Sequence, residues 1–272
     1  MTRLEEYGWR GEVAPGLARI VSAHGDYYRL VCNESEAFVL ARKKKSAFRE
    51  GGLLPITGDF VSFVYNAQGE SMITSVLPRF SFFERKDPTA RRKAQTLAVN
   101  FDTLFIMMSL NENFSTARVA RFLDLAADCG RAEVVVAVTK VDLFLPGDEE
   151  RFADLAEQVA SRAPILRLSS VTGEGLSAVR DYAAAGRTLA FIGSSGVGKS
   201  TLLNVLAGEE IAATQEIQAW SGKGRHTTTV RELTRIPCGA LIVDTPGIRE
   251  IGRVGETDEL LVKGESTHRW RK

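Results

Sequence analysis

The stretch Gly193-Ser194-Ser195-Gly196-Val197-Gly198-Lys199-Ser200 decides how the second half of this 272-residue chain folds. It matches the pattern G-x-x-x-x-G-K-[S/T] at every fixed position. An apolar run at 188–192 precedes it and predicts a strand, and residues 199–207 predict a helix. A glycine-rich turn between a strand and a helix presents backbone N–H groups and a helix N-terminus to an anion. A turn that only caps the helix is the alternative. The complete match favours a phosphate loop, with Thr201 just behind it.

Two positions of this loop have predicted chemical roles. Lys199 is expected to reach the β- and γ-phosphates of a nucleoside triphosphate and to assist its hydrolysis, and the Ser200 hydroxyl is expected to bind Mg²⁺. A second Mg²⁺ anchor is predicted in Asp244-Thr245-Pro246-Gly247, which follows the apolar segment 240–243. Asp244 would hold the metal, and the Gly247 N–H would meet the γ-phosphate. Such a turn is common in isolation, but beside a phosphate loop it indicates a metal-dependent nucleotide site.

A base-reading motif precedes the phosphate loop in the chain. Thr139-Lys140-Val141-Asp142 closes a predicted strand at 133–138. The Asp142 carboxylate can accept hydrogen bonds from the N1–H and 2-amino groups of guanine, and the Lys140 stem can lie over the ring. Ser169-Ser170-Val171-Thr172-Gly173 follows a predicted strand at 165–168 and is placed to offer N–H groups to the guanine oxygen. A solvated charge pair and an ordinary turn are the alternatives for these two segments.

The segment Gly224-Arg225-His226-Thr227-Thr228-Thr229 lies between the phosphate loop and Asp244. One threonine here is expected to bind Mg²⁺ and to sense the γ-phosphate, and Thr228 is favoured. The stretch 212–223 before it has no clear period, as expected of a segment that nucleotide orders.

The first part of the chain reads as all-β. Period-two alternation predicts strands at 16–22, 27–32, 36–41, 59–65 and 71–77, separated by turn residues. Five short strands at this spacing favour a small barrel, with the oligonucleotide-binding (OB) fold as the leading candidate. Residues 1–78 are therefore predicted to form an RNA-binding barrel.

From residue 100 onward, strands and helices alternate. Strands are predicted at 103–109, 133–138, 165–168, 188–192 and 240–243, and helices at 116–129, 148–162, 176–184 and 199–207. Strands joined through helices predict crossover units and a mostly parallel sheet. The predicted fold class is an α/β phosphate-loop domain over 100–252 behind the barrel. Residues 79–99 are predicted as a charged linker and 253–272 as a tail.

Composition narrows the class of protein. Lys plus Arg is 35 and Asp plus Glu is 34, so net charge says nothing about nucleic acid; only local basic runs such as Arg42-Lys43-Lys44-Lys45, 85–86 and 91–93 bear on it. Each run is equally compatible with a solvated surface. Three scattered cysteines without a CxxC pair support neither a disulfide framework nor a zinc site. Without an apolar signal region or a run of about 18 to 20 apolar residues, a cytoplasmic protein without membrane contact is expected.

These motifs together resemble those of Ras-like GTPases, but the base-reading pair precedes the phosphate loop. That circularly permuted order behind a β-barrel resembles the ribosome small-subunit-dependent GTPase A (RsgA) family. Residues 224–229 look like its switch I, 244–250 like its switch II, and Gly58-Asp59-Phe60-Val61 like a return strand of its barrel. The resemblance covers about residues 15–252.

The resemblance implies a monomer that hydrolyses GTP to GDP, is stimulated by the 30S ribosomal subunit, contacts 16S rRNA through the barrel and acts in late subunit maturation. Family members usually continue into a zinc domain, whereas this sequence has one histidine, His268, and no cysteine after Gly252. Zinc binding is therefore not carried over. Ile248 stands where Ras-like enzymes place a water-orienting glutamine. His226 is our candidate for that role, because a neutral imidazole can accept a hydrogen bond from water; a packing or capping histidine is the alternative.

Two other functions remain open. One is a nucleotide-gated RNA- or ribosome-binding module in which hydrolysis is incidental. The other is an ATPase with the same phosphate loop. Turnover with and without 30S subunits separates the first from a regulated GTPase, and the nucleotide preference of an Asp142→Asn variant bears on the second.

Overall fold

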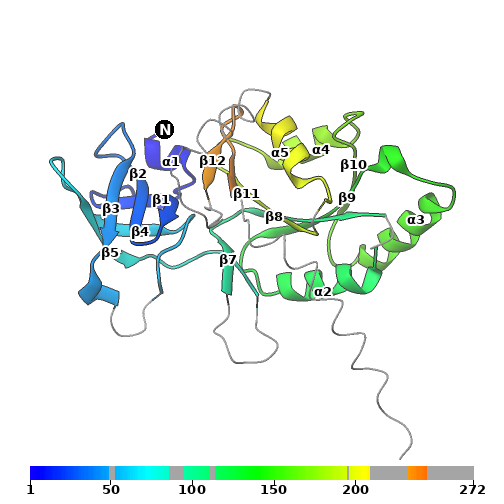
Figure 1. Cartoon of the computed structure of the whole chain (residues 1–272), viewed down its shortest axis with the longest axis horizontal. Coiled ribbons are helices and arrows are strands. Elements are labelled where there is room, and N and C mark those ends of the chain that lie inside the picture. Colours follow the sequence, from blue (N-terminus) through cyan, green and yellow to red (C-terminus); the bar gives the residue numbers. More distant parts are fainter. Residues whose placement is uncertain (49–52, 86–94, 111–113, 195, 209–231, 244–272) are drawn as a thin grey trace, which may run out of the picture.

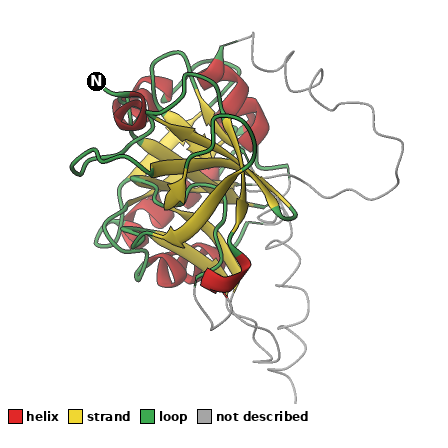
Figure 2. Ribbon diagram, turned by 90° about the vertical axis from the view of Figure 1, so that its left-hand side faces the viewer, coloured by secondary structure: helices red, strands yellow, loops and turns green. Residues whose placement is uncertain are grey.

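The structure, a computed structural model, describes residues 1–48, 53–85, 95–110, 114–194, 196–208 and 232–243. Within them, a closed barrel lies beside a six-stranded sheet, with helices on both faces of the sheet (Figures 1 and 2). Both parts of the predicted fold class are confirmed. No helix of the described part has the length and hydropathy needed to cross a membrane.

Five strands form the barrel: β1 (Leu17–His24), β2 (Tyr27–Cys32), β3 (Val39–Lys43), β4 (Phe60–Val64) and β5 (Ser71–Val76). They close in the order β1-β2-β3-β5-β4, with β3 and β5 parallel and the other pairs antiparallel. Alternate side chains such as Ile20, Leu30 and Ile73 fill the interior and are fully buried. The short helix α1 (Arg3–Glu6) precedes the barrel, and the 3₁₀ turn η1 (Lys45–Phe48) follows β3. This is the predicted five-stranded OB architecture.

The sheet has the order β10-β9-β8-β11-β13-β12. All neighbours are parallel except β12 and β13. Its strands are β8 (Thr103–Ser109), β9 (Glu133–Thr139), β10 (Ile165–Leu168), β11 (Thr188–Gly193), β12 (Leu233–Arg235) and β13 (Leu241–Val243). The helices are α2 (Thr116–Ala126), α3 (Asp148–Val159), α4 (Leu176–Tyr182) and α5 (Lys199–Ala207), with the 3₁₀ turn η2 (Val141–Leu143) after β9. Sequence periodicity missed β12, a three-residue edge strand too short to show a period.

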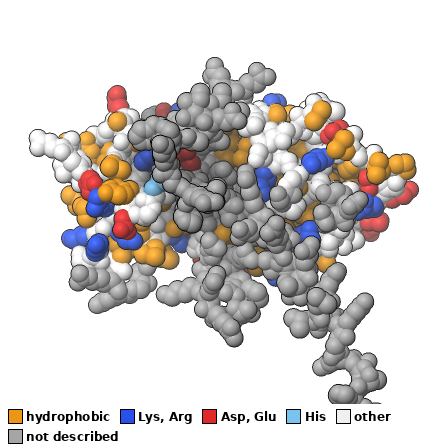
Figure 3. Space-filling view, in the orientation of Figure 1, with side chains coloured by type: hydrophobic (Ala, Val, Ile, Leu, Met, Phe, Trp, Pro, Cys, Tyr) orange, Lys and Arg blue, Asp and Glu red, His pale blue; other side chains and the backbone are white. Residues whose placement is uncertain are grey.

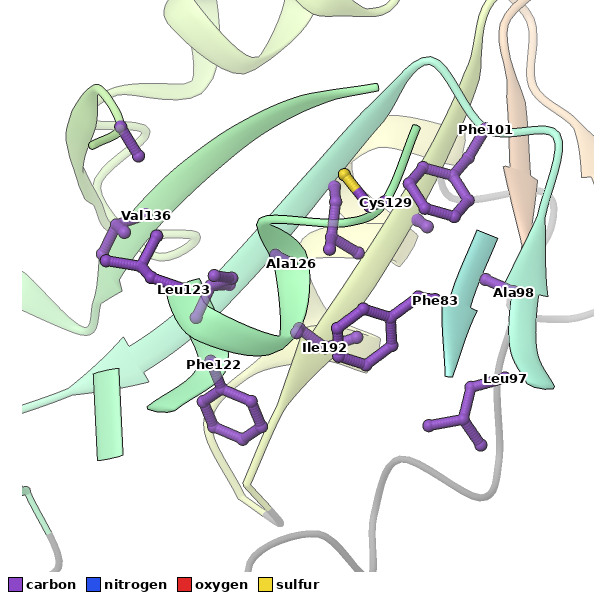
Figure 4. Packing of buried hydrophobic residues seen from close by; sticks show 14 of the residues in the cluster. Phe83, Leu97, Ala98, Phe101, Phe122, Leu123, Ala126, Cys129, Val136 and Ile192 are labelled. Carbon is purple, nitrogen blue, oxygen red and sulfur yellow. The ribbon is translucent and has the colours of Figure 1, made fainter. Parts of the chain in front are cut away.

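Alternating side chains of the central strands bury both faces of the sheet. On β8, Ile106 belongs to one apolar cluster, which it shares with α2 and α3. Phe105 and Met107 belong to the other cluster, which includes side chains of α4 and α5. Figure 4 shows part of the first cluster, with Phe122 of α2 among the side chains that pack there. Burial on both faces accounts for the nearly continuous apolar runs of these strands.

Residues 79–99, predicted as a linker, include the hairpin strands β6 (Phe82–Arg85) and β7 (Gln95–Val99). Phe83 and Leu97 are buried in the cluster formed with α2 (Figure 4). The described part of this segment is thus packed onto the sheet domain. The sequence missed the hairpin because charged residues dominate it after Phe83. The domain boundaries themselves stay a prediction.

One arginine joins the barrel to the sheet. Arg19 of β1 is fully buried, and its guanidinium donates to the carbonyl oxygens of Tyr7 (2.6 Å), Asn100 (2.8 Å) and Gly58 (3.3 Å). It also donates to the Thr188 hydroxyl, 3.0 Å away at the start of β11. Burial lowers the pKa of Arg19 to about 9, so it stays charged at neutral pH. The barrel is therefore tied to the strand that ends in the phosphate loop.

Candidate nucleotide-binding site

The phosphate loop begins where β11 ends, and its backbone requires glycine at several positions. A Cβ placed on Gly193 would lie 2.5 Å from the Met107 carbonyl oxygen, so the loop passes too close to β8 for any side chain. Gly196 and Gly198 have φ values of +76° and +95°, a region that L side chains rarely adopt. The described part of the loop thus has the tight, glycine-dependent turn that a phosphate cradle needs.

Helix α5 starts directly behind this turn, at Lys199. Its N-cap is Gly198, which offers no side-chain cap, so no side chain of the N-cap competes for the first N–H groups of the helix. Ser200 lies exposed in the first turn. The Lys199 ammonium donates to the Gly193 carbonyl oxygen at 2.9 Å and so folds back across the loop. Amide groups, a helix N-terminus and a lysine converge at one place, which suits a polyphosphate.

Thr139 connects the base-reading motif to the phosphate loop. Its buried hydroxyl lies 2.6 Å from the Val197 carbonyl oxygen and 3.0 Å from the Met108 carbonyl oxygen. A hydroxyl has one hydrogen to donate, and the Val197 oxygen is the nearer acceptor. Sequence reasoning grouped Thr139 with the nucleotide ligands. In this structure its hydroxyl holds the loop in position against β9 and β8.

The two base-reading segments are hydrogen-bonded to one another. The Ser169 hydroxyl, fully buried, donates to Asp142 Oδ1 at 2.5 Å. The Ser169 hydroxyl oxygen itself accepts from the backbone N–H groups of Val171 and Thr172, at 3.2 and 3.1 Å. Ser169 therefore shapes the 169–173 turn and orients the carboxylate at once. Asp142 is exposed, so the carboxylate remains accessible to a base.

Lys140 lies between the base-reading and phosphate segments. Its backbone is left-handed, with φ 61° and ψ 37°, which is unusual for a residue other than glycine. A Cβ built on Gly198 would lie 4.0 Å from Lys140 Cε, so the lysine stem passes over the phosphate loop. Backbone strain of this kind is typical of ligand-binding positions. It supports the prediction that Lys140 belongs to the site.

The topology explains why these segments meet. Strands β9, β8 and β11 are parallel neighbours, and β10 pairs with β9. Their carboxyl ends therefore lie along one edge of the sheet, where ligands of open α/β sheets bind. Thr139, Ser169 and Gly193 each stand at or just after a strand end on that edge. Ser194 and Ser170 follow at the same edge and are half-buried, and Thr201 is exposed in the first turn of α5.

Part of the predicted site lies outside the described residues: Ser195, His226, Thr228, Asp244 and Gly247. Strand β13, which precedes Asp244, pairs with β11 through Ala190 and Val243. Of the predicted Mg²⁺ ligands, Ser200 is described, and its exposed position in the first turn of α5 fits a hydroxyl ligand beside bound phosphates. Sequence reasoning did not foresee that Thr139 and Ser169 bond to other site residues, because nothing in the spacing of their motifs shows which groups their hydroxyls meet.

Comparisons with known proteins agree with this geometry. The family model of the RsgA GTPase matches residues 76–254. The small ribosomal subunit biogenesis GTPase RsgA 2 of Lactiplantibacillus plantarum is 39% identical over 243 residues, which are 86% of this chain and 66% of that protein. The small ribosomal subunit biogenesis GTPase RsgA of Leptospira interrogans is 34% identical over 272 residues, which are 94% of this chain and 72% of that protein. The chain thus spans about two thirds of the length of these relatives.

Solved structures with a similar fold are found as well. The crystal structure of YjeQ from Thermotoga maritima matches with a TM-score of 0.63 and 26% identity, over 85% of this chain and 74% of that chain. YloQ, described as a circularly permuted GTPase, matches with a TM-score of 0.56 and 22% identity, which is a likeness of fold alone. The resemblance read from the order of the motifs is confirmed: the chain belongs to the RsgA GTPase family.

Proposed function

We propose that the chain binds GTP at the edge formed by β9, β10 and β11 and hydrolyses it to GDP and phosphate. Two hydrogen bonds carry this proposal. One joins Ser169 to Asp142 within the base-reading segments, and the other joins Thr139 to the Val197 carbonyl oxygen of the phosphate loop. Both hydrogen bonds lie at the carboxyl edge of the sheet, which supports a guanine-binding carboxylate and a phosphate cradle in one site. Family membership and the names of the relatives support the same reaction.

Hydrolysis in this site would proceed by in-line attack of water on the γ-phosphorus. The amides of the phosphate loop and the Lys199 ammonium would neutralise the charge that grows on the β–γ bridging oxygen. To do so Lys199 exchanges its present acceptor, the Gly193 carbonyl oxygen, for phosphate oxygens. Ser200, Thr228 and Asp244 would hold Mg²⁺, which supplies further positive charge to the phosphates.

His226 is proposed to orient the attacking water, because Ile248 has no group that can do so. A His226→Ala variant is expected to bind GTP normally and to turn it over more slowly when a partner stimulates it. His226→Gln is the matched variant, since an amide oxygen also accepts a hydrogen bond from water. Equal stimulated turnover in wild type and His226→Ala removes His226 from the mechanism.

The partner we propose is the small ribosomal subunit. The relatives are named for small ribosomal subunit biogenesis, and the barrel offers a surface for RNA. On the outer side of β2 and β3, Arg29 lies opposite Leu40 and Tyr27 opposite Arg42. The Arg42 guanidinium stacks 4.2 Å from the centre of the Tyr27 ring, and Arg29 lies 4.6 Å from the centre of the Phe38 ring.

Both arginines are half-buried and are paired with glutamates, Arg29 with Glu232 and Arg42 with Glu70. Arginines and aromatic rings together are typical of surfaces that bind single-stranded nucleic acid. Figure 3 shows hydrophobic, basic and acidic side chains intermixed at the barrel end of the molecule. The strand 2–3 face is also where OB folds bind oligonucleotides. We propose that this face contacts 16S rRNA and that 30S binding stimulates the GTPase during late maturation of the subunit.

One set of samples tests both parts of the proposal. Purified 30S subunits are mixed with wild type or Asp142→Asn in the presence of GTP, ATP or no nucleotide, and binding and phosphate release are recorded together. We expect GTP-dependent binding and faster phosphate release with subunits, with the preference for GTP lost in Asp142→Asn. Binding without faster release would favour a nucleotide-gated RNA-binding module. Equal use of ATP by the wild type would contradict guanine recognition.

A further inference from the structure

A cavity lies at the seam between the barrel and the sheet domain, away from the nucleotide site. Its volume is about 220 Å³, and it is lined by Gly8, Trp9, Arg10, Gly11, Phe60, Pro78, Phe80, Asp102 and Arg131. Asp102 directly precedes β8, so the cavity belongs to the amino ends of the parallel strands. The phosphate loop lies at their carboxyl ends. A ligand in the cavity would therefore not touch the nucleotide.

Three aromatic side chains line this seam cavity. The centres of the Trp9 and Phe60 rings are 5.1 Å apart with an interplanar angle of 60°, and Phe80 adds a third ring. Trp9 and Phe80 are half-buried, so part of each remains accessible from the cavity. Ligand sites commonly measure roughly 300–1,000 Å³. The seam cavity, at about 220 Å³, is smaller and suits one flat ring system.

Two arginines belong to the cavity lining. Arg10 and Arg131 are both exposed. The single carboxylate, Asp102, is already engaged: Oδ1 accepts from Arg10 at 2.5 Å, and Oδ2 accepts from the Thr188 N–H at 2.8 Å. The Arg10 guanidinium is also 5.9 Å from the centre of the Phe80 ring. Two arginines beside one paired carboxylate favour an anionic ligand over a cationic or neutral one.

We propose that the seam cavity takes up one unstacked base of a single-stranded RNA, whose flanking phosphates contact Arg10 and Arg131. Aromatic rings and arginines in one cavity lining supply the two interactions that hold single-stranded RNA, namely stacking on a ring and contact with phosphate. The cavity is too small to enclose a whole nucleotide. A base delivered by a strand that also contacts the protein elsewhere therefore fits it better than a free mononucleotide. The inference deepens the RNA-binding part of the proposed function, at a place separate from the β2–β3 face.

The test uses the full chain and fluorescently labelled single-stranded RNA hexamers, with binding followed by anisotropy. Trp9→Leu removes the ring, and Trp9→Phe keeps one. Both variants lose the hydrogen bond from the indole N–H to the Glu12 carbonyl oxygen, so their comparison isolates stacking. We expect binding to weaken about fivefold or more in Trp9→Leu, as when one base–aromatic stack is lost, and to change less than about twofold in Trp9→Phe.

A second set of probes identifies the base. Hexamers carrying one abasic nucleotide at each position in turn are titrated into wild type and Trp9→Leu. At one position, loss of the base should weaken the wild type and leave Trp9→Leu unchanged, because the stack is already gone. Free adenosine and uridine monophosphates serve as competitors and are expected to compete only weakly. Tight competition by a mononucleotide would instead assign the cavity to a free nucleotide and overturn the proposal.

The arginine contact is tested with one variant and a matched control variant. Arg131→Ala is expected to weaken RNA binding. It should also reduce the slope of the logarithm of affinity against the logarithm of salt concentration by about one. Arg180→Ala removes an equally exposed arginine on α4 and should change neither. Unchanged binding in Trp9→Leu, equal abasic effects in both proteins, or no measurable RNA binding by the wild type would each overturn the proposal.

A fluorescent GDP analogue titrated in the same samples separates the two proposals. The Trp9 and Arg131 variants should keep the wild-type affinity for it. If the wild type fails to bind the analogue, the proposed GTPase function fails, but the RNA results still stand. If only the RNA results fail, the nucleotide site is unaffected.

Discussion

Replacing Thr139 with valine tests whether one hydroxyl joins the base-reading edge to the phosphate loop. Valine keeps the shape of threonine at this buried position and removes the hydroxyl 2.6 Å from the Val197 carbonyl oxygen and 3.0 Å from that of Met108. Losing a donor and leaving a buried acceptor unpaired costs about 1–3 kcal/mol. We expect Thr139→Val to lower the free energy of unfolding by that amount.

The same change should weaken nucleotide binding, because the Val197 carbonyl is part of the loop that is proposed to bind the phosphates. If about 1–2 kcal/mol of the loss falls on the loop conformation, affinity for a fluorescent GDP analogue drops about 5- to 30-fold. Urea unfolding and nucleotide titration measure the two quantities. Thr139→Ser keeps the hydroxyl and is the control, with affinity expected near that of the wild type. A Thr139→Val protein with unchanged affinity, or a serine variant as weak as valine, refutes the proposed link.

Three further predictions concern the loop, the base and the seam. Gly193→Ala should reduce nucleotide affinity more than tenfold in a titration, roughly 1.4 kcal/mol or more, because the new Cβ would lie 2.5 Å from the Met107 carbonyl oxygen; unchanged affinity would mean that the loop tolerates a side chain at this position. Asp142→Asn should erase the preference for GTP over ATP in competition binding, since an amide cannot accept both guanine hydrogen bonds, and a retained preference would place base recognition elsewhere. Arg19→Met should lower the free energy of unfolding in urea by about 3 kcal/mol or more, because the carbonyl oxygens of Tyr7, Gly58 and Asn100 each lose a hydrogen bond from the guanidinium; a loss under about 1 kcal/mol would mean that the barrel is held mainly by other contacts.

The sequence predicted the strands and helices of the sheet domain closely because their physical signals are local. Strand β8 and helix α5 have the predicted bounds. A continuous apolar run defines the strand, and a phosphate-loop motif that leads into a helix defines the start of α5. The predicted helix at 116–129 instead ends at Ala126, and β3 begins at Val39 instead of residue 36. Ends of elements are decided by packing and capping, which a periodic pattern does not contain.

The β6–β7 hairpin is the largest feature that the sequence did not predict. Its charged residues suggested a linker, yet Phe83 and Leu97 lie in the core beside α2. Ala98 of the same hairpin is buried there as well, and Val99 is also buried. The apolar cluster that holds Phe83, Leu97 and Ala98 includes side chains of helix α2, which lies further along the chain, so a local sequence pattern does not predict the hairpin.

By itself, the sequence predicted a nucleotide ligand and determined the order of the motifs, because a glycine-rich loop, a predicted base-reading acid and the strands before them are each short contiguous signals. Tertiary structure decided which groups of those motifs meet. Thr139 reaches the carbonyl oxygen of Val197, Ser169 holds Asp142, and Arg19 ties the barrel to the start of β11. These contacts join residues far apart in the chain, and they depend on strand order and register, which only the folded sheet and barrel establish.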